Sequence, residues 1–143
     1  MIPRGLRNNN PLNIRRTNTK WQGLCDVQTD KSFFQFQTMG YGYRAAFKNI
    51  RTYILNGYDT DRDGNPNELE DVISRWAPPF ENHTENYIKT VVRLSGLKRD
   101  EIIDYRNKEQ MTQLVAAMSF VENGVYANLK DVETGWNLYV KSL

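Results

Sequence analysis

The sequence is poor in the residues from which most metal and nucleophilic sites are built. It contains one cysteine, Cys25, and one histidine, His83. A single cysteine excludes an internal disulfide and a cysteine cluster for zinc, which fits synthesis in a reducing compartment. The lone histidine has no serine or cysteine at a sequence spacing that is typical of a catalytic triad. A nucleophilic triad and a histidine-rich zinc site are therefore both disfavoured.

The chain also lacks long apolar runs and a strong excess of either charge. No stretch approaches the length of a membrane-spanning segment, and the first residues contain no apolar core of a signal peptide. We expect a protein made in the cytoplasm without a signal peptide and without membrane insertion. Its net charge of +2 is too small to indicate a nucleic-acid partner.

The sequence does contain apolar residues with helical periodicity. Its length of 143 residues suits a single domain over 1–143. Apolar residues recur at spacings of three and four in several segments, three of which are followed by a glycine that can end a helix. The expected helices begin at about Tyr43, Asn67, Thr84, Asn107 and Asp131. The expected terminal glycines are Gly57, Gly96 and Gly124.

The first 31 residues have a different character, rich in Arg, Asn and Gly, and predict an ordered loop with short strands. The aromatic run Phe33–Phe36 is typical of a strand, and a partner strand can begin at Trp21. The sequence thus predicts a mainly α (α+β) domain of four to five helices with a small N-terminal β element.

Glu122 is the first candidate for chemistry. Glycoside cleavage needs a carboxylic acid that can donate a proton to the leaving oxygen, and burial beside apolar residues favours the protonated form of such a group. Glu122 follows Met118 by four and Val115 by seven residues, so it projects from the apolar stripe of its helix. The alternative is a glutamate at the end of a helix that reaches out to water.

The densest mixture of aromatic, rigid and hydrogen-bonding residues lies between Trp76 and Tyr87. Aromatic faces suit the apolar faces of sugar rings, and amides suit N-acetyl and hydroxyl groups, so the segment has the composition of a sugar site. The alternative is a capped turn between helices in which Trp76 is core, Thr84 caps, and Glu81 and Glu85 favour the helix start.

The segment from Asp59 to Glu70 matches the twelve-residue calcium loop D-x-D-x-D-G-x5-E, between two predicted helices. The predicted oxygen ligands are Asp59, Asp61, Asp63, the Asn65 carbonyl and Glu70, with Asn67 directly or through water. Pro66 departs from the usual apolar residue at the eighth position. The ion would be structural, with no cofactor required for catalysis; the alternative is a solvated acidic loop.

Several blocks of residues recur in a known group of proteins. They are Arg4–Arg15 with its Arg-Asn-Asn-Asn-Pro-Leu-Asn-Ile-Arg run, Trp21-Gln22-Gly23, Phe34-Gln35-Phe36, Gly42-Tyr43-Arg44-Ala45, Arg75-Trp76-Ala77-Pro78-Pro79-x-Glu81-Asn82-x-Thr84-x-x-Tyr87-Ile88 and Glu122-Asn123-Gly124. With these blocks nearly the whole chain resembles phage and prophage proteins described as virion structural proteins or lysozyme-like endolysins. The resemblance implies a lysozyme-like fold and action on the cell wall, after release or as part of a virion.

A second resemblance concerns mechanism. Cell-wall glucosaminidases and lytic transglycosylases place a catalytic Glu at a helix end, in a pattern similar to Glu122-Asn123-Gly124. An Asn-rich stretch, a Trp-x-Gly and an aromatic strand then follow, whereas here those elements come first. The rotated order suggests a circularly permuted domain whose N-terminal loop packs beside the end of the Glu122 helix. It implies a groove lined by Asn13, Trp21, Arg44, Asn82 and Tyr87, with Trp76 and Thr84 as further substrate-binding residues.

These resemblances imply a monomeric glycosidase or lytic transglycosylase whose partner is the peptidoglycan glycan strand. Glu122 would be the general acid and then a base. No second carboxylate is obvious, so either Glu81 activates water or the substrate attacks its own reacting carbon. The alternatives are a non-catalytic virion structural or cell-wall-binding protein, and a peptidoglycan endopeptidase.

Overall fold

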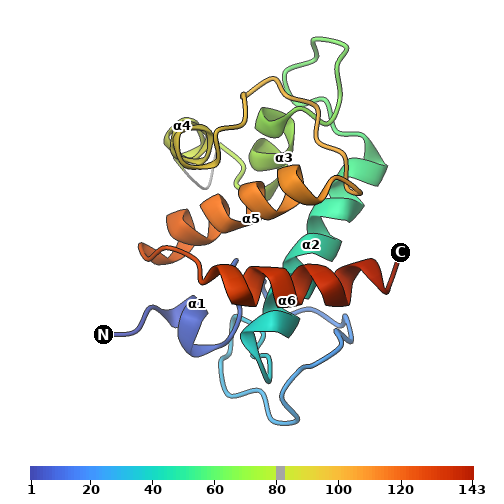
Figure 1. Ribbon diagram of the computed structural model, residues 1–143. Helices are drawn as coiled ribbons and strands as arrows, with labels where there is room; N and C mark the ends of the chain where they lie inside the picture. The colour runs from blue at the N-terminus through green and yellow to red at the C-terminus, as the bar shows by residue number, and fades with distance from the viewer. Residues whose placement is uncertain (80–82) are drawn as a thin grey trace.

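The computed structural model describes residues 1–79 and 83–143, and Figure 1 shows the arrangement of their helices. The six helices of the described residues are α1 (Arg4–Arg7), α2 (Met39–Asn56), α3 (Leu69–Trp76), α4 (Thr84–Ser95), α5 (Lys108–Asn123) and α6 (Leu129–Val140). The mainly α class is therefore confirmed. Of the helices described, none is long and apolar enough to span a lipid bilayer.

The core forms where α6 crosses α2, with α5 lying against α4 and α6 (Figure 1). The two backbones approach closely because Gly135 stands at the crossing, where a Cβ would overlap the Cβ of Tyr43. Beside it the rings of Phe47 and Trp136 meet edge to face at 5.4 Å, and Tyr139 lies 5.5 Å from Phe47. These rings are fully or almost fully buried, and they pack together between α2 and α6.

Local chemistry sets both ends of α5 as the sequence predicts. The side chain of Asn107 accepts a hydrogen bond from the backbone N–H of Gln110 at 3.0 Å and so caps the first turn. Gly124 ends the helix with a φ of 69°, a left-handed conformation that glycine adopts without a Cβ clash. The predicted ends of α2 at Gly57 and of α4 at Gly96 are also confirmed.

The starts of α3 and α4 differ from the prediction. Glu68, not Asn67, precedes α3, and the side chains of Glu68 and Asp71 each accept a hydrogen bond from the other's backbone N–H. Asn67 has a φ of 68° and its carbonyl accepts from Ile103. Thr84 is the first residue of α4 instead of its cap, because its hydroxyl donates to the carbonyl of Ala77.

The sequence analysis also predicted the wrong first residue for α6 and α2. α6 follows Asn128, whose side chain accepts from the N–H groups of Lys130 and Asp131, so the expected cap Asp131 lies inside the first turn. α2 begins at Met39, four residues before the expected start, because Thr38 caps it through the N–H of Tyr41. The single turn α1 was not expected at all.

The expected N-terminal sheet is not confirmed, since the described residues contain isolated antiparallel bridges and no strand. Backbone groups of residues 34–36 form hydrogen bonds with three other parts of the chain, at Ile14, Asn8 and Cys25. Side-chain amides take up the remaining backbone groups: the amide of Asn10 bonds both the N–H and the carbonyl of Ile14 and the carbonyl of Phe34. A ladder of consecutive bridges therefore does not form.

The N- and C-termini lie on opposite sides of the view in Figure 1. Close termini, which the permutation hypothesis invoked, are not a feature of this fold. The N-terminal segment nevertheless reaches the last turn of α5, where Asn123 donates a hydrogen bond to the Pro11 carbonyl at 2.8 Å. The juxtaposition that the rotated motif order predicts is therefore present.

We predict that Asn10→Ala lowers the free energy of unfolding by about 3 kcal/mol, because it removes three hydrogen bonds and leaves buried backbone groups of Ile14 and Phe34 without partners. Urea unfolding followed by circular dichroism measures the change. Asn18→Ala, at an exposed position of the same segment, is the control and should stay within about 0.5 kcal/mol of wild type. Equal effects of the two substitutions would contradict this account.

Candidate active site

The carboxyl group of Glu122 lies in the last turn of α5 and accepts hydrogen bonds from three separate parts of the chain. Asn13 donates its side-chain amide to Oε1 at 3.2 Å. The hydroxyl of Tyr87 donates to Oε2 at 3.0 Å, and the indole N–H of Trp76 to the same oxygen at 3.4 Å. All three donors are uncharged side chains, so they fix the orientation of the carboxyl without an ion pair.

The N-terminal segment positions Asn13. Asn13 itself has a φ of 52°, and its N–H is bonded to the carbonyl of Asn10. Gly5 of α1 lies where a Cβ would come within 3 Å of side-chain oxygens of both Asn123 and Asn13. A glycine at this position lets α1 lie directly against the end of α5, and Asn13 is thereby brought within reach of Glu122.

Tyr87 and Trp76 come from the two helices that flank residues 80–82. Trp76 is the last residue of α3, and Tyr87 lies in the first turn of α4 with 8% of its surface exposed. Burial, and after it the charge of Glu122, raise the pKa of Tyr87 well above its usual value. Tyr87 therefore stays protonated and acts as a hydrogen-bond donor over the whole physiological pH range.

Glu122 lies between two hollows in the surface. We call the first the Trp76 hollow, with a volume of about 370 Å³, and the second the Asn86 hollow, with about 340 Å³. The Trp76 hollow is lined by Leu12, Asn13, Ile14, Arg15, Thr17, Phe33, Asn49, Tyr53, Trp76, Ala77 and Glu122. The Asn86 hollow is lined by His83, Asn86, Tyr87, Thr90, Val121 and Glu122. Of the described residues, Glu122 alone belongs to both linings.

Other residues expected in the groove lie elsewhere. Trp21 packs on the small apolar cluster of Ile14, Phe34, Phe36 and Ala45, against which Trp76 also packs, but it lines neither hollow. Arg44 is buried in α2 with 9% of its surface exposed. Thr84 is buried and lines a third hollow near Glu85 and Arg99. Glu81 and Asn82 lie outside the described residues.

Several residues of the two hollows were not among the predicted site residues, and four of them form two pairs. Asn49 and Tyr53 reach the Trp76 hollow from α2, and Asn86 and Thr90 reach the Asn86 hollow from α4. Both pairs are four residues apart, so each pair shares one helix face. These residues could have been predicted from sequence by one pattern. In each pair, two hydrogen-bonding side chains stand four positions apart at the edge of the apolar stripe of a helix.

The acidic loop before α3 folds differently from the sequence pattern. Asp59, Asp61 and Asp63 bring carboxylate oxygens within 4.8 Å of one another, and a second group joins Asp61 to Glu68 and Asp71. Loss of water contact first, and then the neighbouring carboxyls, raise the pKa of Glu68 to about 7 and that of Asp61 to about 6.

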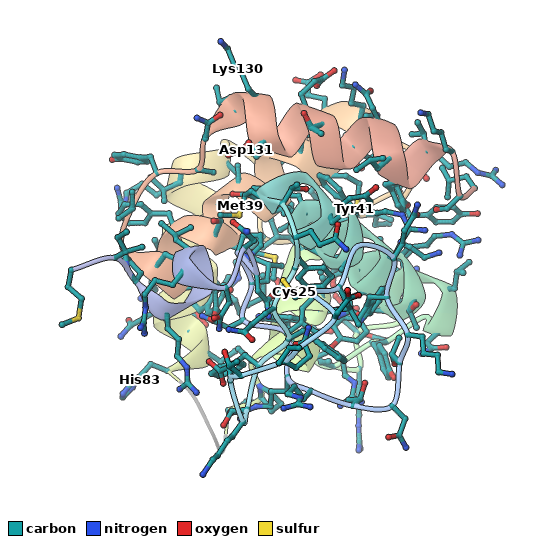
Figure 2. The ribbon with its side chains drawn as sticks, turned by 90° about the horizontal axis from the view of Figure 1, so that it is seen from below. Cys25, Met39, Tyr41, His83, Lys130 and Asp131 are labelled. Atoms are coloured by element: carbon teal, nitrogen blue, oxygen red, sulfur yellow. The ribbon has the colours of Figure 1, made fainter. Side chains whose placement is uncertain are left out.

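Glu70, the expected last ligand of the calcium loop, is not brought to this cluster. It accepts a hydrogen bond from the guanidinium of Arg99 at 3.2 Å instead. Arg99 also pairs with Glu85 at 2.6 Å and so ties the start of α3 to the start of α4. Cys25 and His83 lie well apart in Figure 2, and neither belongs to a group of possible metal ligands among the described residues.

The chain matches no known family model. It is 38% identical over 124 residues to a protein of Pseudoalteromonas phage PM2 called "Protein P5", an alignment that covers 85% of this chain and 71% of that protein. The name of the relative states no activity.

We predict that Gly5→Ala lowers the free energy of unfolding by about 1–3 kcal/mol, because the added methyl group forces α1 away from the end of α5. Thermal unfolding measures the loss. Arg7→Ala, in the same turn but exposed, is the matched control and should leave the melting temperature almost unchanged. A tolerated methyl group at residue 5 would mean that α1 does not lie tightly against α5.

Proposed function

We propose that this chain, which belongs to the family of Protein P5 of Pseudoalteromonas phage PM2, cleaves the glycan strand of bacterial peptidoglycan with Glu122 as general acid. The observation that carries the proposal is the position of Glu122, whose carboxyl stands between two hollows and is oriented by Asn13, Trp76 and Tyr87. A glycosidase needs a carboxyl fixed at the bond to be cut, with room for sugar on both sides of it.

The groups that hold the Glu122 carboxyl in the described part of the chain are neutral, so its orientation involves no ion pair there. A fixed cation beside a carboxyl favours its ionised form and opposes proton donation. Among the described residues no salt bridge involves Glu122, and the groups that hold it are an amide, an indole and a phenol. The group can therefore give a proton to the leaving oxygen and take one back without breaking an ion pair.

The composition of the hollows supports a carbohydrate ligand. The Trp76 hollow combines the aromatic side chains of Phe33, Tyr53 and Trp76 with the amides of Asn13 and Asn49. Aromatic faces stack on sugar rings, and amides bond N-acetyl and hydroxyl groups. Arg15, also in this lining with its guanidinium 5.4 Å from the Phe33 ring, suits the carboxylates that peptidoglycan carries on its peptide stems.

In the reaction, Glu122 protonates the glycosidic oxygen as the bond between that oxygen and the sugar carbon breaks. The leaving sugar departs as an alcohol, and the positive charge that develops on the remaining sugar is faced by the Glu122 carboxylate. Glu122 is the one carboxylate among the described residues that line the two hollows. This favours attack by a hydroxyl of the substrate itself, which transfers its proton to Glu122 and leaves an anhydro sugar.

Glu81 offers the hydrolytic alternative. If it takes a proton from water at the opposite face of the sugar, the product has a reducing end. Digestion of purified peptidoglycan with mass spectrometry of the fragments separates the outcomes. Anhydro sugars indicate transglycosylation, reducing ends indicate hydrolysis, free amines indicate an endopeptidase, and no release from several peptidoglycan types indicates a binding or structural protein.

We predict that Glu122→Gln lowers the rate of glycan release by about a hundredfold or more, because glutamine keeps the shape of the acid but does not transfer its proton. The variant should melt within a few degrees of wild type. Glu109→Gln, at an exposed position near the start of the same helix, is the matched control and should retain full activity. Full activity of Glu122→Gln would remove the catalytic role from α5, and Glu81→Gln would then be the next variant to assay.

We predict that Tyr87→Phe lowers kcat by about ten- to a hundredfold, since a hydrogen bond to a charged group contributes about 1.5–3 kcal/mol. The ring is retained, so packing in α4 and the KM should change little. Tyr126→Phe, which removes a hydroxyl from an exposed tyrosine outside both hollows, provides the comparison. A large rise in KM at constant kcat would make Tyr87 a sugar-binding residue instead of one that positions Glu122.

A further inference from the structure

The loop between α2 and α3 gathers carboxylates that the cleavage reaction does not use. One oxygen each of Asp59, Asp61 and Asp63 lies within 4.8 Å of the other two. Such a group is common on protein surfaces and by itself indicates no ligand. The neighbouring Glu68 adds a separate observation.

Glu68 is a buried acid with an oxygen that lacks a partner. The residue is 4% exposed, and its Oε1 is fully covered and accepts no hydrogen bond among the described residues. The side chain also accepts the N–H of Asp71. A carboxylate oxygen of Glu68 lies within 4.8 Å of Asp61, and the Glu68 carboxyl interacts with that of Asp63. A buried oxygen without a donor is costly, and a cation among these groups would remove the cost.

The hydrogen bonds of the loop engage one oxygen each of Asp59, Asp61 and Asp63 and leave the other without a backbone partner. Asp59 uses Oδ2 to accept from Gly64 at 2.9 Å, and its Oδ1 is buried without a partner. Asp61 uses Oδ1 for the N–H of Asp63, and Asp63 uses Oδ1 for the N–H of Asn65. Asp71, by contrast, is fully engaged, because Oδ1 accepts from Thr60 and Oδ2 from Glu68. Asp71 therefore holds the loop to α3, while the other four acids are free to bind an ion.

No basic side chain neutralises these four acids within the part of the chain that the structure describes. The salt bridges there join Arg4 to Asp30, Lys108 to Glu133, and Arg99 to Glu70 and Glu85. Arg99 thus draws Glu70 away from the loop, and the acid that remains at the cluster is Glu68, two residues earlier.

We propose that the loop binds one calcium ion, with Asp59, Asp61, Asp63 and Glu68 as its carboxylate ligands and Glu68 in the place that the sequence pattern gives to Glu70. Hard oxygen ligands from an irregular loop suit calcium, which accepts six to eight oxygens in flexible geometry, better than magnesium, which demands near-ideal octahedral geometry. Water and backbone carbonyls complete the shell. The site is independent of the proposed glycan cleavage.

The test is calorimetry of the full chain after treatment with a chelator, with calcium chloride as the titrant. We expect binding of one ion and a rise in the melting temperature with calcium. Asp61→Asn, at an exposed position, and Glu68→Gln should each weaken binding by about tenfold or more because each removes a ligand charge. Glu70→Gln should bind calcium as wild type does, because the Glu70 carboxylate forms a salt bridge with Arg99 and is not a ligand.

The melting temperature measured without calcium distinguishes a variant that has lost a ligand from one that does not fold. Glu68→Gln removes one of several mutually repelling carboxylates, so its ion-free form should melt at or above the wild-type temperature while its gain from calcium shrinks. Absence of heat and of any melting shift up to the millimolar calcium concentrations at which the weakest such sites bind would overturn the proposal. A larger loss of affinity in Glu70→Gln than in Glu68→Gln would overturn the ligand assignment.

Discussion

The side-chain amide of Asn123 donates one hydrogen bond to the carbonyl of Pro11 and another to Ser119 in its own helix, and so closes the N-terminal segment onto the end of α5. Residues next to this pair form the site: Asn13 follows Pro11 by two, and Glu122 immediately precedes Asn123. Gly5 leaves the space that this approach requires. The bond from Asn13 to Glu122, and the N-terminal side of the Trp76 hollow, both depend on this contact.

The helices were predictable where one residue alone determined the end of an element. Asn107 and Gly124 set the limits of α5 by local bonding, and both were foreseen. Predictions failed where neighbouring residues compete for the same role. Asn67 was the expected cap of α3, but Glu68 and Asp71 cap it jointly. The predicted sheet is absent from the described residues for a related reason, because the amide of Asn10 bonds backbone groups that a strand would have paired.

The centre of the candidate site was also accessible from sequence, since the spacing from Val115 and Met118 placed Glu122 on the apolar side of its helix. The loop acids show the limit of such reasoning. The motif fixed Asp59, Asp61 and Asp63 through local turns, but the position of Glu70 depends on Arg99, which lies 29 residues later. A spacing pattern holds no information about a distant cation that competes for one of its members.

The bond between Asn13 and Glu122 spans 109 residues of chain, which has a consequence for synthesis. At about 5–20 residues per second, a ribosome needs on the order of ten seconds to make the chain between the two partners. During that time the N-terminal segment has emerged without the helix end on which it packs. Contacts of this range close late because the entropy of the intervening loop opposes them. An incomplete chain thus contains Trp76 and Tyr87 but no oriented acid, and the Trp76 hollow is complete only after translation has passed Asn123.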